Sequence, residues 1–174
     1  MYMSRELAKS ALSTSKAIQV EVNQLWLPPA EGLPSRQEMV LARSLVKGTR
    51  GYIESVVNQI NSTYENGCYD ACAVMIRRLV ETLIIEAFEH HNIADRIKTP
   101  TGDFFYLSDL ITHALNEKSW NVGRNAKQAL PKLKSIGDLS AHSRRHLAHR
   151  SDIDKIMDDL RTAVQELIYL ANLK

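Results

Sequence analysis

The sequence predicts an all-α protein, a bundle of five to seven helices preceded by an N-terminal helical arm. Apolar residues recur at intervals of three and four along most of the 174 residues, which is the period of one helix face. No segment alternates apolar and polar residues as a strand does, and no hairpin signal occurs. Apolar residues make up 44% of the chain and charged residues 24%, as in ordinary globular proteins.

The first predicted helix covers residues 4–26 and is expected to form the arm. Its small and apolar side chains keep one helical spacing: Leu7, Ala11, Ile18, Val22 and Leu25. The proline-containing segment 27–34 then interrupts helical hydrogen bonding. We therefore expect two parts, with helix and linker in residues 1–35 and the bundle domain in residues 36–174.

The next helix is expected to begin at the capping pattern of Ser35 and Glu38 and to end at Gly48. Pro131 is expected to start or kink a later helix, and Ser151 is the predicted cap of the last one. The remaining helices are expected over residues 50–65, 68–91, 106–118, 123–142 and 151–174, with a loop over 92–105. Segment 68–91 is apolar on most sides, so it is the predicted central buried helix.

Several classes of protein are not indicated. The N-terminus lacks a continuous apolar segment and no stretch approaches 18 apolar residues, so neither secretion nor membrane spanning is expected. Cys68 and Cys72 lie on neighbouring turns of one predicted helix, an awkward geometry for a disulfide, and a cytoplasmic location is expected. No Gly-rich phosphate loop, Gly-x-Ser-x-Gly or HExxH motif occurs, and no cofactor is expected.

Positive charge is concentrated in residues 124–150. Seven basic residues and one acidic residue give this segment a charge of +6, against +2 for the whole chain. Within it and just beyond, the stretch 136–152 holds three histidines and three arginines. Local fields of this kind attract phosphate or acidic partners. A solvated basic face is the simpler alternative.

Arg77 and Arg78 interrupt the apolar segment 68–91, and Glu81 follows them by four and three residues. Either arginine can therefore pair with Glu81 on one helix face. We interpret the three as an internal ion pair that fixes helix packing, because a buried charge needs a partner. The alternative is that one arginine meets a phosphate or the stretch 136–152.

The segments NGCYDACAVMIRRLVETLI (66–84) and LKSIGDLSAH (133–142) carry two motifs, Arg-Arg-x-x-Glu and Ile-Gly-Asp followed by His. Together they resemble a bacterial domain-of-unknown-function family of the HEPN superfamily, which is often attached to restriction and phage-defence proteins. The resemblance covers about residues 50–172. It implies a helical bundle that commonly forms homodimers and, in active members, a metal-independent ribonuclease site at the dimer interface.

The resemblance implies that catalysis centres on His142, because active members use an arginine followed by a histidine. Histidine can take the proton of a ribose 2′-hydroxyl near neutral pH, and arginine can hold the charge of the phosphorane. The candidate catalytic residues are His142, Arg144, His149 and Lys134. The candidate nucleic-acid-binding residues are Arg145, Arg150, Lys132 and Arg78. Structural roles are assigned to Arg77, Glu81 and Asp138.

This sequence has Ser135 where the family often has arginine, and Asp138 where asparagine is usual. Two functions are therefore open, a ribonuclease or a non-catalytic module that binds nucleic acid or a partner protein. Two other interpretations of the stretch are a divalent metal site and a plain helix end. The metal site would use Asp138, His142, His146 and His149, but the predicted break before Ser151 opposes it, and no metal is expected. In the plain helix end, His142 packs or caps beside Asp138, and residues 144–150 form a solvated loop.

Overall fold

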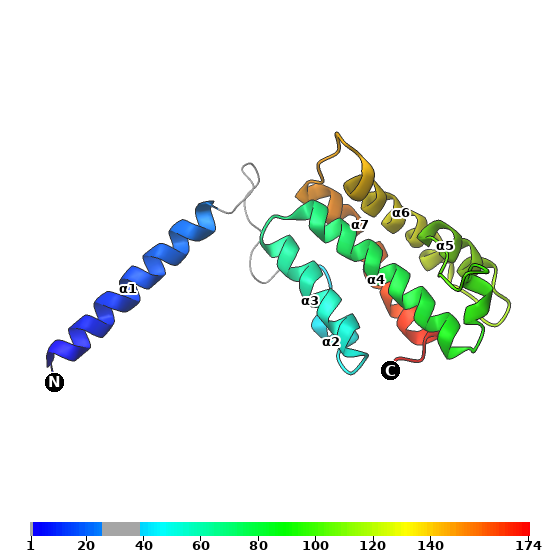
Figure 1. Cartoon of the computed structure of the whole chain (residues 1–174), viewed down its shortest axis with the longest axis horizontal. Coiled ribbons are helices and arrows are strands. Elements are labelled where there is room, and N and C mark those ends of the chain that lie inside the picture. Colours follow the sequence, from blue (N-terminus) through cyan, green and yellow to red (C-terminus); the bar gives the residue numbers. More distant parts are fainter. Residues whose placement is uncertain (1, 26–38) are drawn as a thin grey trace. The chain divides into compact units, whose positions relative to one another are not determined.

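The computed structural model describes residues 2–25 and 39–174. The chain divides into two units, residues 1–32 and 33–174, and helix α1 (Tyr2–Leu25) belongs to the first (Figure 1). Three predictions lie outside the described residues: the linker over 27–34, the capping pattern of Ser35 with Glu38, and the boundary at residue 35.

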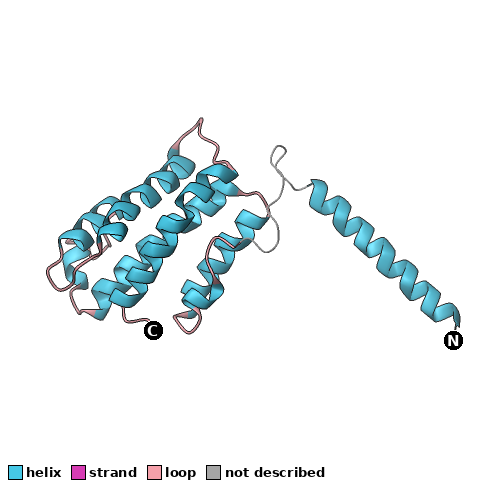
Figure 2. Ribbon diagram, turned by 180° about the vertical axis from the view of Figure 1, so that it is seen from behind, coloured by secondary structure: helices cyan, strands magenta, loops and turns pink. Residues whose placement is uncertain are grey.

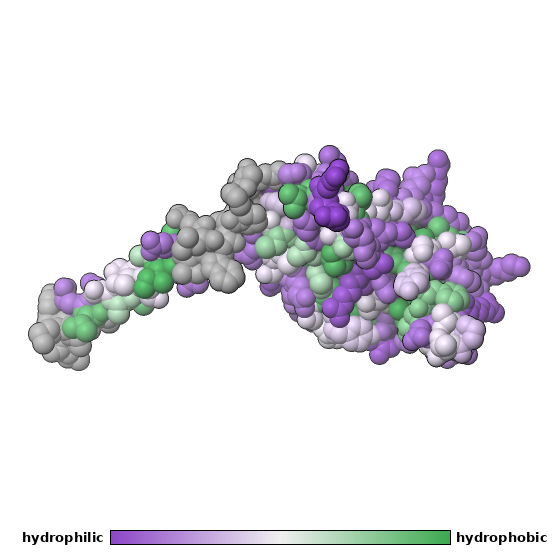
Figure 3. All heavy atoms as spheres, turned by 45° about the horizontal axis from the view of Figure 1, so that its top comes forward, coloured by the Kyte–Doolittle hydropathy of each residue, from purple (hydrophilic) through white to green (hydrophobic). Residues whose placement is uncertain are grey.

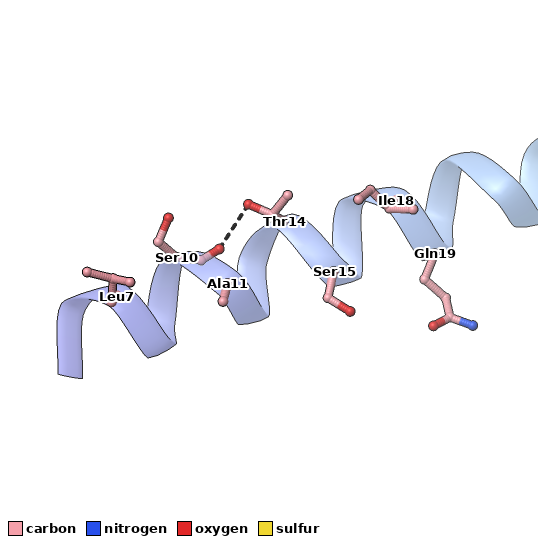
Figure 4. A pocket seen from close by; sticks show the side chains of 7 residues that line it. All are labelled: Leu7, Ser10, Ala11, Thr14, Ser15, Ile18 and Gln19. Atoms are coloured by element: carbon pink, nitrogen blue, oxygen red, sulfur yellow. Dashed lines mark hydrogen bonds between the residues drawn. The ribbon is translucent and has the colours of Figure 1, made fainter. Parts of the chain in front are cut away.

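Helix α1 carries small and apolar side chains along one face, as the sequence spacing predicts. A depression runs along this face, and Figure 4 shows the residues that line it: Leu7, Ser10, Ala11, Thr14, Ser15, Ile18 and Gln19. The Thr14 hydroxyl donates to the carbonyl oxygen of Ser10 at 2.9 Å. Leu7 and Ile18 are 70% and 55% exposed, so α1 itself buries neither side chain.

The second unit confirms the predicted helical bundle (Figure 2), since residues 39–174 contain helices and loops but no strand. Its helices are α2 (Arg43–Val46), α3 (Gly51–Glu65), α4 (Tyr69–His90), α5 (Leu107–Asn116), α6 (Arg124–His142) and α7 (Arg150–Leu170). The predicted loop between α4 and α5 contains one 3₁₀ turn (Ala94–Ile97) and an isolated bridge between Lys98 and Phe104.

Helix α4 is the centre of the bundle, as its apolar sequence predicts. It packs against α3, α5, α6 and α7, and Ile76, Leu79 and Leu83 are fully buried. Full burial of such a side chain contributes about 1.5–3 kcal/mol. Helices α4 and α6 run antiparallel (Figure 1) and approach closely at Gly137. A Cβ atom on Gly137 would lie only 2.5 Å from the Cβ of Arg77, so glycine permits this crossing.

Residues 39–42 are not helical, which corrects the described part of the helix predicted over 35–48. Val40 and Leu41 form bends, and within residues 39–48 only the four residues of α2 are helical. Side chains from other elements bind this backbone. The Asn61 amide accepts from the Leu41 N–H at 3.0 Å and donates to the Leu41 carbonyl at 2.8 Å. Arg161 donates to the two preceding carbonyls at 3.0 and 3.2 Å, so these groups are satisfied without a helix.

Pro131, predicted as a start or a kink, lies inside α6, so it is not a start, and it leaves one carbonyl of the preceding turn without a helical partner. One predicted helix end differs from the structure. The cap of α7 is His149 and not Ser151. His149 and Asp152 form a capping box, in which the His149 N–H donates to the Asp152 carboxylate at 3.0 Å. Histidine is not among the preferred capping residues, so the sequence alone favours Ser151 as the cap of α7.

Candidate functional site

The two sequence motifs meet where α4 crosses α6. Arg77 Nε donates to Asp138 Oδ1 at 2.8 Å, and Arg77 Nη1 lies 3.5 Å from Glu81 Oε2. Lys134 Nζ donates to the other carboxylate oxygen of Asp138. Asp138 therefore binds one cation from each helix, and Arg77 joins the two acidic groups. Arg77 thus pairs with Glu81, as the first interpretation of the Arg-Arg pair predicts, and it also contacts the stretch 136–152 through Asp138, as the alternative predicts.

The two cations keep Asp138 ionised. Burial raises the pKa of Asp138, but hydrogen bonds and charge from Lys134 and Arg77 outweigh it and hold the pKa below its usual value. The three side chains are only 24–29% exposed, so solvent screens this cluster less than a surface pair. The cluster braces α4 against α6, and its cations are not free to bind an external phosphate.

Other basic residues of the segment 124–150 are also paired. Lys132 Nζ lies 2.8 Å from Asp159 Oδ2. Arg150 Nε lies 3.6 Å from Asp154 Oδ2 and donates to the Tyr64 hydroxyl at 3.2 Å. The Tyr64 hydroxyl in turn donates to Asp154, and burial together with this hydrogen bond raises the pKa of Tyr64 to about 12. Lys132 and Arg150 therefore contribute less free positive charge than the sequence indicates.

Two exposed cations of the segment 124–150, Arg144 and Arg145, lie on the Arg–His loop, residues 143–149, which connects α6 to α7; the exposed Arg124 and Lys127 lie in the first turn of α6. Figure 1 shows this loop projecting beyond the ends of both helices. Arg144 and Arg145 are exposed and form no hydrogen bond or ion pair with any residue that the structure describes. The same holds for the side chains of His142, the last residue of α6, and of Arg78 on α4. These four side chains are open to a ligand.

The Arg–His loop is anchored at both ends. At its start, the Ser143 N–H donates to the Leu139 carbonyl at 3.1 Å. At its end, the Ala148 N–H donates to Asp70 Oδ1 on α4 at 3.0 Å, and the capping box holds His149. A loop with fixed ends loses less conformational freedom when it binds a ligand. The two exposed arginines are therefore presented on a partly pre-organised support.

Of the four candidate catalytic residues, two have structural contacts and two are exposed at the end of α6. Lys134 precedes His142 by eight residues of α6, which is about 12 Å along the helix, and its ammonium group binds Asp138. His149 takes part in the capping box of α7. His142 and Arg144 are the two that lie together at the exposed C-terminal end of α6.

Sequence reasoning did not single out Asp70 or the Tyr64–Asp154 pair. Asp70 lies in the first turn of α4, where an acidic residue is explained by the helix dipole alone. Tyr64 belongs to the apolar stripe of α3 and its hydroxyl gives no separate signal. Their partners are 78 and 90 residues away in the chain, so spacing could not reveal either contact.

No metal centre is formed within residues 2–25 and 39–174, since no three His, Cys, Asp or Glu side chains there could hold an ion together. The same residues include no helix with the length and apolar character needed to cross a membrane. The exposed side chains offer guanidinium and imidazole groups, which suit phosphate oxygens.

Comparison with known proteins gives one match. A family model described as Domain of unknown function (DUF4145) matches residues 58–174. No curated protein and no solved structure matched the chain. The matched segment includes both sequence motifs, the ion-pair cluster between α4 and α6, and the Arg–His loop. The chain belongs to the family described as Domain of unknown function (DUF4145).

Proposed function

We propose that this protein is an HEPN-like helical module that binds the phosphate backbone of RNA through the Arg–His loop. The observation that carries the proposal is the exposure of Arg144 and Arg145, which have no partner among the described residues, on a loop anchored at both ends. Arginine binds phosphate through two parallel N–H groups, and such contacts supply most of the sequence-independent affinity for nucleic acid.

The geometry supports binding better than catalysis within one chain. A general base needs a neighbouring group that orients its ring, but His142 has no hydrogen-bond partner in the described part of the chain. The ammonium group of Lys134 forms an ion pair with Asp138, and the Asp138 carboxylate would repel a phosphate placed beside it. His149 is used as a helix cap.

A metal-independent ribonuclease formed by a homodimer is the second candidate. The feature that favours it is the exposed ring of His142 two residues before exposed Arg144. In a homodimer a second copy could supply the orienting group, His142 would take the 2′-hydroxyl proton, and Arg144 would stabilise the phosphorane. Both candidate functions include the proposed HEPN relationship. The homodimer and a role in phage defence belong to the ribonuclease candidate. The resemblance of the Arg-Arg-x-x-Glu and Ile-Gly-Asp motifs supports all three.

We also propose a cytoplasmic location, and the state of the two cysteines supports it. Both are free thiols, with Cys68 exposed at the start of α4 and Cys72 buried one turn later. Burial raises the pKa of Cys72 to about 12, so its thiol is kept protonated and unreactive.

One experiment separates the two candidate functions. Purified protein is mixed with labelled single-stranded and hairpin RNA in EDTA, and both binding and cleavage are followed for wild type, His142→Ala and the double variant Arg144→Ala/Arg145→Ala. We expect wild type to bind without cleaving, His142→Ala to bind almost as well, and the double variant to lose most affinity. Cleavage that leaves cyclic phosphate ends and disappears in His142→Ala would establish the ribonuclease instead. Wild type that binds no RNA would contradict both.

A further inference from the structure

A groove between α6 and α7 forms a second surface on the bundle. Its volume is about 480 Å³, and its lining residues come from both helices and from His146 of the Arg–His loop. Ile136 and Ile156 are almost fully buried and form apolar parts of its wall, whereas Leu139 is 45% exposed. We call this surface the α6–α7 groove. Figure 3 shows hydrophobic patches between hydrophilic regions on one face of the molecule.

His146, which lines the groove, also has a polar atom without a hydrogen-bond partner in the described part of the chain. His146 Nε2 is buried, yet it forms no hydrogen bond with any described residue. A buried polar atom of this kind costs free energy unless a partner binds it. A ligand in the groove would cover the apolar wall, and it would bind Nε2 only if the His146 ring turned towards it.

The outermost charges of the groove are positive. Lys132 on α6 and Lys155 on α7 have side chains 58% and 73% exposed. Their acidic partners, Asp159 and Asp152, are only 30% and 28% exposed. Each ammonium group is paired with its carboxylate, at 2.8 Å for Lys132 and 3.5 Å for Lys155, but it is the more exposed member of its pair, and the two lie one on each side of the apolar wall. Acidic side chains complement this arrangement.

We propose that the α6–α7 groove binds an acidic amphipathic helix of a partner protein. Along α6, Pro131, Ser135 and Leu139 line the groove at intervals of four residues, a length of about 12 Å or two helical turns. An amphipathic helix offers apolar side chains at i, i+4 and i+7 over the same length. Its flanking carboxylates lie beside Lys132 and Lys155. The proposal does not depend on the RNA-binding function.

The test uses a stapled helical peptide of about 16 residues, with leucines on one face and glutamates beside them. A charge-reversed peptide carries lysines in place of the glutamates. Binding is measured by fluorescence anisotropy to the full chain. We expect the acidic peptide to bind at least about tenfold more tightly than its charge-reversed form.

Two leucine variants supply a matched comparison. Leu139→Asp places a charge in the groove, and Leu147→Asp places the same charge at a leucine that is 71% exposed and outside the groove lining. Both positions are exposed, so neither change disturbs the core. We expect Leu139→Asp to weaken binding of the acidic peptide about tenfold and Leu147→Asp to weaken it much less.

Three results would overturn the proposal. The first is equal binding of the acidic and charge-reversed peptides, and the second is an equal effect of the two leucine variants. The third is a change of the free protein from dimer to monomer in Leu139→Asp, measured by sedimentation, since a second copy would then cover the groove. Peptide binding that persists in Arg144→Ala/Arg145→Ala, in a protein that has lost RNA affinity, would show the two surfaces to be independent, as we expect.

Discussion

Replacing Gly137 with alanine tests the close approach of α4 and α6, which brings the two family motifs together. The new Cβ atom would lie 2.5 Å from the Cβ of Arg77 and 3.1 Å from the carbonyl oxygen of Ala73. Both of these atoms are fixed by the backbone of α4. Non-bonded carbon atoms pack best at about 3.5–4.0 Å, so the helices must separate by roughly 1 Å.

The magnitude follows from two opposing effects. Overpacking of this kind costs about 1–3 kcal/mol, and alanine gains about 1 kcal/mol over glycine in helix propensity. Because the 2.5 Å contact is with an atom fixed by the backbone of α4, we take the upper end of the overpacking cost and expect Gly137→Ala to lower the free energy of unfolding by about 2 kcal/mol. Gly51→Ala is the matched control, because nothing lies within 4 Å of a Cβ atom at the first residue of α3. That change should be neutral or stabilising by up to about 1 kcal/mol.

The assay is urea unfolding of wild type and both variants, followed by far-UV circular dichroism. Equal slopes in denaturant for the three proteins would show that only stability has changed. A Gly137→Ala variant as stable as wild type would refute the reasoning, because α4 and α6 could not then be in contact at this glycine. The same loss of stability in Gly51→Ala would also refute it.

Three further predictions concern the acidic and phenolic groups. The hydrogen bond from Arg96 lowers the pKa of Glu117 to about 2 from an ordinary 4.5, so its contribution to stability is present above pH 4.5 and is lost as the pH falls towards 2. Glu117→Gln should flatten this acid slope, and an unchanged slope would contradict the contact. Tyr64→Phe should lower the free energy of unfolding by about 1–2 kcal/mol and remove the tyrosine that titrates near pH 12 in ultraviolet absorbance; survival of that titration would assign it to another tyrosine. Asp70→Ala should speed amide hydrogen exchange at Ala148, whose N–H it binds, whereas unchanged exchange would mean that the Arg–His loop is held by other contacts.

The long helices could be predicted from the sequence because each carries a continuous apolar stripe that must face the core. The predictions for α3, α4 and α6 differ from the structure by only a residue or two at each end. Residues 39–42 could not be predicted in the same way. Their backbone is held by Asn61 and Arg161, which lie about 20 and 120 residues further along the chain. Local spacing carries no information about such partners.

In the candidate site too, local sequence patterns could be predicted and long-range contacts could not. The sequence locates the positive charge in residues 124–150 but not the acids that neutralise part of it. Asp138 binds Arg77 from 61 residues away, and Lys132 binds Asp159 from the next helix. Fewer of the candidate cations are exposed and unpaired than the sequence predicts, and Arg144 and Arg145 are among them. Only the packing of α4, α6 and α7 decides which cations stay free.

The salt dependence of RNA affinity tests most directly whether Arg144 and Arg145 bind phosphates. The logarithm of the affinity falls with the logarithm of the salt concentration by about 0.7 for each phosphate contact to a single strand. Arg144→Ala/Arg145→Ala should therefore reduce the slope by about 1.4. The control Arg124→Ala/Lys127→Ala, in the first turn of α6, should leave the slope unchanged. A double variant of the loop that keeps the wild-type slope would contradict the proposed function.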